Sequence, residues 1–321
     1  MKKALYAVLA IFLVIILANL TQYHADIPLD ELKPAYAPPP SKFMMMDGAM
    51  VHYRDEGTGF PIVLVHGMSS SLHTWQGWTD ILSKKYRVIR MDLPGWGLTG
   101  PNANNKYDIP YYESFLSRFL DSLGVKECYM AGNSLGGFIT WNYALHHPQQ
   151  VKKMVLLDAA GYPMKEPPFI ASLGRSKILS PVLRHITPHF IVEMSMKQVY
   201  GDPSKITDSA TERYFKLALR AGNRGAFIAF VNQFKENDTL PIQQIATPTL
   251  IEWGEKDRWI PLRFARDFNR DIKGSKLVVY PGVGHIPMEE IPAQSCADAL
   301  RFFDGPMDTV KADSVLTENK H

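Results

Sequence analysis

The pentapeptide 132–136, Gly-Asn-Ser-Leu-Gly, places Ser134 between two glycines where an apolar run meets a helix-like run. Residues 127–131 are typical of a short buried strand, and residues 138–145 are typical of a helix. A serine hydroxyl is a weak nucleophile, so it needs a tight turn that exposes its oxygen to a base and to backbone N–H donors. The pattern therefore predicts a nucleophile elbow, rather than a solvated serine in a glycine turn.

A nucleophilic serine needs a histidine base and an acid, which follow an elbow of this kind in the order serine, acid, histidine. Asp257 comes after the apolar run 250–253, and His285 comes after the apolar run 277–280. The carboxyl ends of parallel strands share one edge of a sheet, so these side chains can converge on Ser134. We expect Ser134 to be the nucleophile, His285 the base and Asp257 the acid.

The acid assignment has alternatives, because Asp158 and Asp92 also follow strand-like runs and Asp257 could only cap a helix near Pro261. The base assignment has fewer, since no other histidine follows a late strand. Two histidines, His146 and His147, precede Pro148 at a helix end, where a cation suits the helix dipole. The other histidines with no partner pattern are expected at the surface or in packing: His52, His73, His185 and His189.

An oxyanion hole completes such a site, and the sequence offers two backbone donors for it. His66-Gly67-Met68 follows the apolar run 62–65. We expect the N–H of Met68 to act together with the N–H of Leu135, the residue after the nucleophile. The His66 side chain is expected to be structural.

These motifs, in this order, resemble the α/β-hydrolase superfamily. The resemblance spans residues 42–303 and rests on the elbow with Gly137, His66-Gly67 with Trp75, the segment 92–97 (Asp-Leu-Pro-Gly-Trp-Gly), Asp257, and the segment 284–287 (Gly-His-Ile-Pro). It implies a mostly parallel eight-stranded sheet with a cap inserted after the sixth strand. Members with aspartate as the nucleophile are haloalkane dehalogenases or epoxide hydrolases, which Ser134 argues against.

The elements that must position these residues fit an α/β fold with helices on both faces of the sheet. Short apolar runs without strict alternation suit strands that are covered on both sides. A hairpin turn at Asp47-Gly48 opens the domain, and the strand-like runs are interrupted once, by an apolar, helix-like stretch. We predict a hydrolase core at residues 42–161 and 245–304, and a helical cap at residues 162–244.

The N-terminus predicts a location. Two lysines precede an uncharged apolar run that is long enough to span a bilayer, so residues 1–20 are predicted to be a transmembrane signal anchor. A cleaved secretory signal is the alternative. The positive-inside rule then places the catalytic domain on the extracytoplasmic, periplasmic side of the cytoplasmic membrane. Residues 21–41 are predicted to be a juxtamembrane linker, and residues 305–321 a disordered tail.

Bulk composition excludes several other classes. The chain has 321 residues, 46% of them hydrophobic, and a net charge of +3 with no dense basic stripe, so no nucleic-acid partner is expected. Cys128 and Cys296 are the only cysteines, which excludes a disulfide framework and favours two separate buried thiols. We expect no cofactor and no metal, and the oligomeric state stays open.

The function predicted first is a membrane-anchored serine hydrolase that cleaves carboxylic esters through an acyl-enzyme, as a carboxylesterase or lipase. Its substrate partner would be a hydrophobic ester or lipid, and basic residues in the early cap extend the hypothesis to phospholipids. The alternative is a carbon–carbon bond hydrolase of the same fold acting on dienoic ring-cleavage products. A non-catalytic tethered binding protein is the third candidate.

Overall fold

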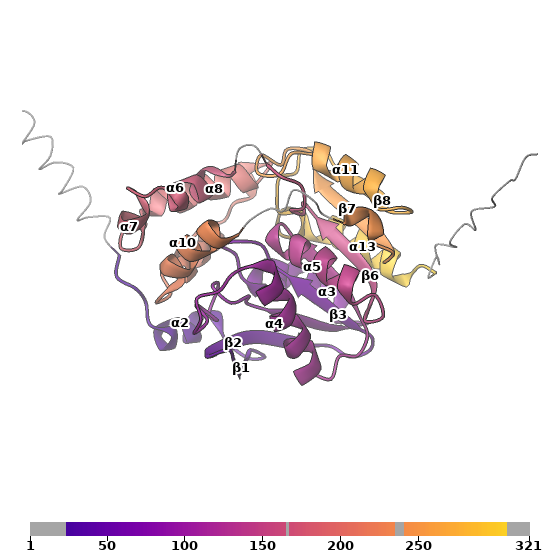
Figure 1. Cartoon of the computed structure of the whole chain (residues 1–321), viewed down its shortest axis with the longest axis horizontal. Coiled ribbons are helices and arrows are strands. Elements are labelled where there is room, and N and C mark those ends of the chain that lie inside the picture. Colours follow the sequence, from indigo (N-terminus) through magenta and orange to yellow (C-terminus); the bar gives the residue numbers. More distant parts are fainter. Residues whose placement is uncertain (1–23, 165–166, 235–240, 307–321) are drawn as a thin grey trace, which may run out of the picture.

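The computed structural model describes residues 24–164, 167–234 and 241–306, and its strands form one sheet in the order β1-β2-β4-β3-β5-β6-β7-β8 (Figure 1). The pairs β1–β2 and β2–β4 are antiparallel, and the other neighbours are parallel. The strands are β1 (Lys42–Met46), β2 (Ala49–Glu56), β3 (Pro61–Val65), β4 (Arg87–Met91), β5 (Cys128–Asn133), β6 (Val151–Leu157), β7 (Thr249–Gly254) and β8 (Lys276–Tyr280).

Helices cover both faces of this sheet, and the alternation of side chains along the strands explains why. In β3, Val63 and Val65 belong to one buried cluster, whereas Ile62 and Leu64 belong to another. The first cluster includes residues of α4 (Ile109–Ser122), α5 (Leu135–His146) and α11 (Arg263–Asp271). The second includes residues of α3 (Gln76–Leu82) and α13 (Pro292–Asp304). The predicted α/β class, with an eight-stranded and mostly parallel sheet, is confirmed.

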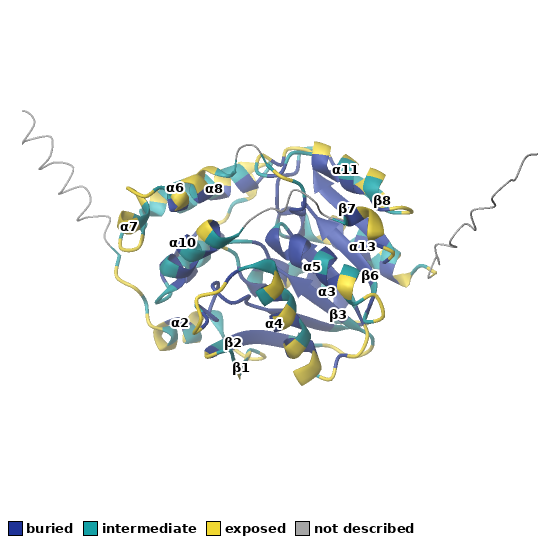
Figure 2. Ribbon diagram, viewed as in Figure 1, coloured by how far each residue is buried: buried dark blue, intermediate teal, exposed yellow. Residues whose placement is uncertain are grey.

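The described chain between β6 and β7 is helical and lies beside the body that holds the sheet (Figure 1). Its helices carry more exposed surface than the inner strands β3 to β7, which are mostly buried (Figure 2). They are α6 (Phe169–Arg175), α7 (Ser180–Leu183), α8 (His189–Val199), α9 (Asp208–Ala218) and α10 (Asn223–Gln233). The division into a core and a cap at residues 162–244 stays a prediction.

The described residues before β1 are packed against the segment that follows α9. They form α2 (Leu29–Tyr36), with Leu32 buried. The N–H of Ile27 donates to the carbonyl of Leu219 at 2.8 Å, and the N–H of Ala221 donates to the carbonyl of Ile27 at 2.9 Å. Residues 24–41, predicted as part of a linker, are therefore tied to the helices between β6 and β7.

The predicted location at the cytoplasmic membrane, with an extracytoplasmic catalytic domain, needs correction. In the described parts of the chain, no helix combines the length and the apolar character that a bilayer span requires. We therefore do not retain that location. The segment 1–20, on which it rested, lies outside the described residues, as does the predicted tail beyond residue 306.

Candidate active site

Ser134 occupies a strained turn between β5 and α5, with φ 55° and ψ −119°. Positive φ is costly for a residue with a side chain, so the surrounding contacts must enforce it. The two motif glycines permit those contacts. A Cβ on Gly132 would lie 2.2 Å from the carbonyl oxygen of Gly136, and a Cβ on Gly136 would lie 2.1 Å from that of Val65. The chain can therefore fold tightly enough to expose the serine only with glycine at both positions.

His285 and Asp257 form a buried pair at the ends of β8 and β7. Nδ1 of His285 donates to Oδ2 of Asp257 at 2.7 Å, and both side chains are almost fully buried. The other carboxylate oxygen, Oδ1, accepts the N–H of Trp259 at 2.7 Å and that of Ile260 at 3.0 Å. These backbone donors fix Asp257, which in turn orients the imidazole.

The second ring nitrogen of His285 is free to act as a base. Nε2 is buried and has no hydrogen-bond partner among the described residues. Ser134 and His285 line the same cavity, and the ring of Trp259 lies 5.4 Å from that of His285, centroid to centroid. The structure thus brings the three predicted residues to one edge of the sheet, with His285 in the wall of the cavity that Ser134 lines.

The two expected oxyanion donors lie next to the nucleophile. Met68 and Leu135 line one cavity together with Ser134, and neither backbone N–H has an acceptor within the described chain. His66 holds the Met68 loop, because its Nδ1 donates to the carbonyl of Gly67 at 2.7 Å and its Nε2 accepts the N–H of Leu93 at 2.9 Å. Burial lowers the pKa of His66, so it stays neutral and structural, as the sequence predicted.

Asp158, one of the alternative acids, lies beside the acid pair. A carboxylate oxygen of Asp158, a carboxylate oxygen of Asp257 and a ring nitrogen of His285 all lie within 4.8 Å of one another. Oδ1 of Asp158 accepts the N–H of Gly254 at 2.9 Å, whereas Oδ2 has no partner among the described residues. Burial and the neighbouring charge of Asp257 raise the pKa of Asp158 well above its usual range. Folding therefore favours the protonated form of Asp158, and Asp257 is the acid hydrogen-bonded to His285.

Asn133 and Trp259 belong to the site but were not singled out from the sequence. Nδ2 of Asn133 donates to the carbonyls of His285, at 2.9 Å, and Leu157, at 3.1 Å. It therefore ties the elbow to the histidine loop. Trp259 lines both cavities beside Ser134. The only sequence signals were position within the elbow motif for Asn133 and closeness to Asp257 for Trp259.

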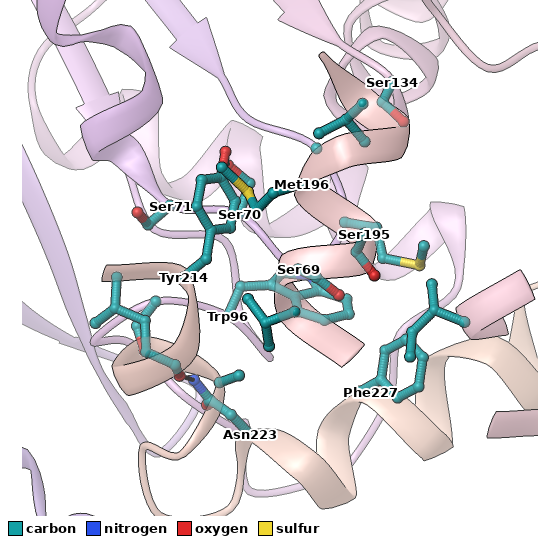
Figure 3. A pocket seen from close by; sticks show the side chains of 18 of the residues that line it. Ser69, Ser70, Ser71, Trp96, Ser134, Ser195, Met196, Tyr214, Asn223 and Phe227 are labelled. Carbon is teal, nitrogen blue, oxygen red and sulfur yellow. Dashed lines mark hydrogen bonds between the residues drawn. The ribbon is translucent and has the colours of Figure 1, made fainter. Parts of the chain in front are cut away.

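A cavity of about 150 Å³ extends from Ser134 among α8, α9 and α10. Figure 3 shows Ser134 with side chains around this space, including Trp96, Met196, Tyr214 and Phe227. Its walls are mostly apolar, which suits an apolar ligand.

The cavity also has two arginines in its wall, and both are paired. Arg213 forms an ion pair with Glu289. Arg224 binds Asp26 at 2.6 Å and donates to the carbonyl of His185 at 2.8 Å. Both cations of the wall are therefore already neutralised by carboxylates.

Comparison with known proteins bears on the fold of the chain. A family model described as the alpha/beta hydrolase fold matches residues 61–292. The 2-hydroxy-6-oxo-2,4-heptadienoate hydrolase of Pseudomonas putida is 27% identical over 255 residues, which cover 76% of this chain and 89% of that enzyme. A meta-cleavage product hydrolase from Pseudomonas fluorescens has a TM-score of 0.72 at 24% identity, covering 82% of this chain and 97% of its own. The solved structure of a membrane phospholipase A has a TM-score of 0.71 at 24% identity, and the match covers 95% of this chain and 99% of that chain. The two solved structures show a shared fold.

Proposed function

The chain belongs to the α/β-hydrolase fold family, and from that premise we propose that it is a serine hydrolase that cleaves uncharged, largely apolar carboxylic esters. One observation carries the proposal. Ser134, on its strained elbow, and His285, whose Nε2 has no hydrogen-bond partner among the described residues, line the same apolar cavity. A nucleophile, its base and an apolar binding space are therefore in one place.

In the proposed reaction, Oγ of Ser134 attacks the ester carbonyl while Nε2 of His285 takes the hydroxyl proton. Asp257 stabilises the imidazolium that forms. The N–H groups of Met68 and Leu135 hold the negative oxygen of the tetrahedral intermediate. The intermediate collapses as His285 returns the proton to the leaving alcohol, which leaves an acyl group on Ser134. Water, activated by the same histidine, then releases the acid.

The charges in the larger cavity favour an uncharged substrate. Burying a carboxylate without a partner is costly, so an anionic substrate needs a cation to receive it. Arg213 and Arg224 are each already paired with a carboxylate, Glu289 and Asp26. An anionic substrate would have to compete with these ion pairs, whereas a neutral ester would not.

The second candidate is a carbon–carbon bond hydrolase acting on a dienoic ring-cleavage product, and the named relatives favour it over the ester hydrolase. Its substrate carries a carboxylate. Arg175, which lines a second cavity beside Ser134, is exposed and makes no ion pair with any described residue. If the protein is such a carbon–carbon bond hydrolase, Arg175 is the group that would bind the substrate carboxylate.

The test compares 2-naphthyl butyrate with 2-hydroxy-6-oxo-2,4-heptadienoate on the wild type, Ser134→Ala and Arg175→Gln. If the protein is an ester hydrolase, the kcat/KM of the wild type for the ester should be at least tenfold above that for the dienoate. Ester hydrolysis should be lost in Ser134→Ala and retained in Arg175→Gln. The opposite preference, with dienoate turnover lost in Arg175→Gln, would establish the second candidate instead. Folding of each variant is checked by its thermal unfolding midpoint.

A further inference from the structure

Two cavities, not one, meet at Ser134. The larger, of about 150 Å³, extends among α8, α9 and α10 (Figure 3). The smaller, of about 70 Å³, lies between α6 and the end of α10. Met68, Ser134 and Trp259 line both. A substrate whose carbonyl carbon sits at Ser134 can therefore extend in two directions.

The catalytic groups are divided unevenly between these cavities. His285 lines the larger cavity and not the smaller one, whereas Leu135 lines the smaller cavity and not the larger one. The tetrahedral carbon bonds to Oγ of Ser134, the negative oxygen, the leaving oxygen and the acyl carbon. The leaving oxygen must lie near His285, because His285 gives it a proton. The negative oxygen must lie near the N–H groups of Met68 and Leu135.

We propose that the larger cavity binds the leaving alcohol and the smaller cavity binds the acyl group. The preferred substrates are then esters of short acids with bulky, apolar, uncharged alcohols. This assignment rests on the ester hydrolase function proposed above and specifies which side of the ester carries the bulk.

The residues that line the two cavities fit this assignment of the acyl group and the alcohol. Ala160, Ala171, Pro168 and Phe234 line the smaller cavity, and Ala171 is buried in α6. Arg175 also lines this cavity, with its Nε donating to the carbonyl of Val231 at 2.8 Å, and the rest of the wall is mostly apolar, which suits a short acyl group. The larger cavity has Ser195 and Met196 of α8 and Phe227 of α10 in its wall, and its arginines are paired. It suits an uncharged apolar group.

The experiment uses two ester series on the full chain. One keeps the 2-naphthyl alcohol and lengthens the acid from acetate through butyrate to octanoate. The other keeps acetate and enlarges the alcohol from ethyl through hexyl to 2-naphthyl. The proposal predicts that kcat/KM falls about tenfold or more from butyrate to octanoate, and that it rises by a similar factor across the alcohol series.

Two matched variants, one in each cavity, separate the assignments. Ala171→Leu should lower kcat/KM for butyrate relative to acetate by about tenfold and keep the ranking of the alcohol series. Ser195→Leu should lower kcat/KM for 2-naphthyl acetate relative to ethyl acetate and keep the ranking of the acyl series. Phe234→Ala, which enlarges the smaller cavity, should raise octanoate relative to butyrate, so the test stands even where Ala171→Leu fails to fold.

Crossed effects would overturn the assignment. In that outcome, Ala171→Leu changes the ranking of the alcohol series and Ser195→Leu changes the ranking of the acyl series. A wild type that hydrolyses no ester at all would refute the proposed function, and the assignment with it. Crossed effects in a protein whose ester hydrolysis depends on Ser134 would refute the assignment alone.

Discussion

The molecule holds two serine–histidine–aspartate groups with nearly the same bonds and different surroundings. In the Ser134 trio (Ser134, His285, Asp257), Nδ1 of the histidine lies 2.7 Å from the acid. In the Ser41 trio (Ser41, His52, Asp92), the corresponding distance is 2.8 Å, and Nε2 of His52 lies 2.9 Å from Oγ of Ser41. By hydrogen bonds alone, the second group is the more complete.

The surroundings of the two serines distinguish chemistry from structure. Ser134 stands on a strained turn at the meeting point of two cavities, beside two free N–H donors. Ser41 lines neither cavity, and its Oγ also accepts a hydrogen bond from Nε of Arg54 at 2.9 Å. We therefore assign the Ser41 trio to holding the residues before β1 onto the sheet. A trio of residue types becomes a site only with space for a substrate and donors for its charge.

The acids differ as well. Asp92 is surrounded by histidines, and although burial opposes ionisation, His52, His73 and His66 hold the pKa of Asp92 far below its usual range. Asp257 instead has a second carboxyl group, Asp158, beside it. The first environment favours the ionised carboxylate of Asp92, and the second raises the pKa of Asp158 beside the acid that supports His285.

The largest difference between the trios should be in activity. Ser134→Ala should lower kcat for a 2-naphthyl ester by about 10⁵- to 10⁶-fold, because the nucleophile is lost. Ser41→Ala, the matched control, should change kcat less than about twofold, since it touches neither cavity. Steady-state kinetics on both variants makes the comparison. An equal loss in the two variants would erase the distinction.

Next in size is the effect of the acid. Asp257→Asn should lower kcat by about 10⁴-fold, because the amide no longer stabilises the imidazolium or selects the correct tautomer. Its KM should stay nearly constant, since Asp257 lies behind the histidine, with its side chain fully buried. Activity within tenfold of the wild type would show that another acid, with Asp158 the nearest, serves His285.

For the Ser41 trio, the expected effect is on stability. Asp92 accepts the N–H groups of Leu72, at 2.7 Å, and Leu98, at 2.8 Å, besides the His52 bond. Asp92→Asn should lower the free energy of unfolding by about 2–3 kcal/mol at pH 7, since it disrupts the hydrogen bonds that a buried carboxylate accepts. The depressed pKa of Asp92 means that its stabilisation is present above the unfolded-state pKa of about 3.9 and is lost as pH falls below it.

The pH dependence provides the check on that prediction. The difference between wild type and Asp92→Asn in urea unfolding should stay nearly constant from pH 7 to about pH 4 and shrink below the unfolded-state pKa of about 3.9. A difference that does not shrink below that pH would mean that the charge of Asp92 does not carry the effect.

The smallest expected effect concerns Asp158. Folding raises the pKa of Asp158, so the ionised form of this carboxyl group destabilises the folded protein. This cost begins above the unfolded-state pKa of about 3.9 and grows as pH rises toward the folded-state pKa. Asp158→Asn removes this cost and should stabilise the protein by on the order of 1 kcal/mol at pH 8, and by less at pH 5. Thermal unfolding at both pH values measures it. A destabilised variant at pH 8 would show that Asp158 is needed as a carboxyl group.

The sequence predicted the sheet because buried parallel strands appear as short apolar runs, and each run matches a strand from β3 to β8. It also named the residues that meet at the sheet edge, because motif order follows strand order. It gave no signal for the pairing of His52 with Asp92, since the two residues are 40 positions apart and only the antiparallel β2–β4 pair joins them.

The packing of residues 24–41 was also out of reach. The Asp26–Arg224 pair joins positions far apart in the chain, and no local pattern marks such a contact. The location at a membrane, inferred from hydropathy of a terminal segment alone, needed correction. Burial of Asp158 beside Asp257 likewise depends on how β6 and β7 align, which residue types do not encode.

We infer that Ser134, alone among the described serines, is an activated nucleophile, and covalent labelling is the sharpest test of this role. A fluorophosphonate probe is incubated with the folded wild type, Ser41→Ala and Ser134→Ala, and the modified peptide is identified by mass spectrometry. We expect one adduct, on Ser134, in the wild type and in Ser41→Ala, and none in Ser134→Ala. An adduct on Ser41, or no adduct on the folded wild type, would contradict it.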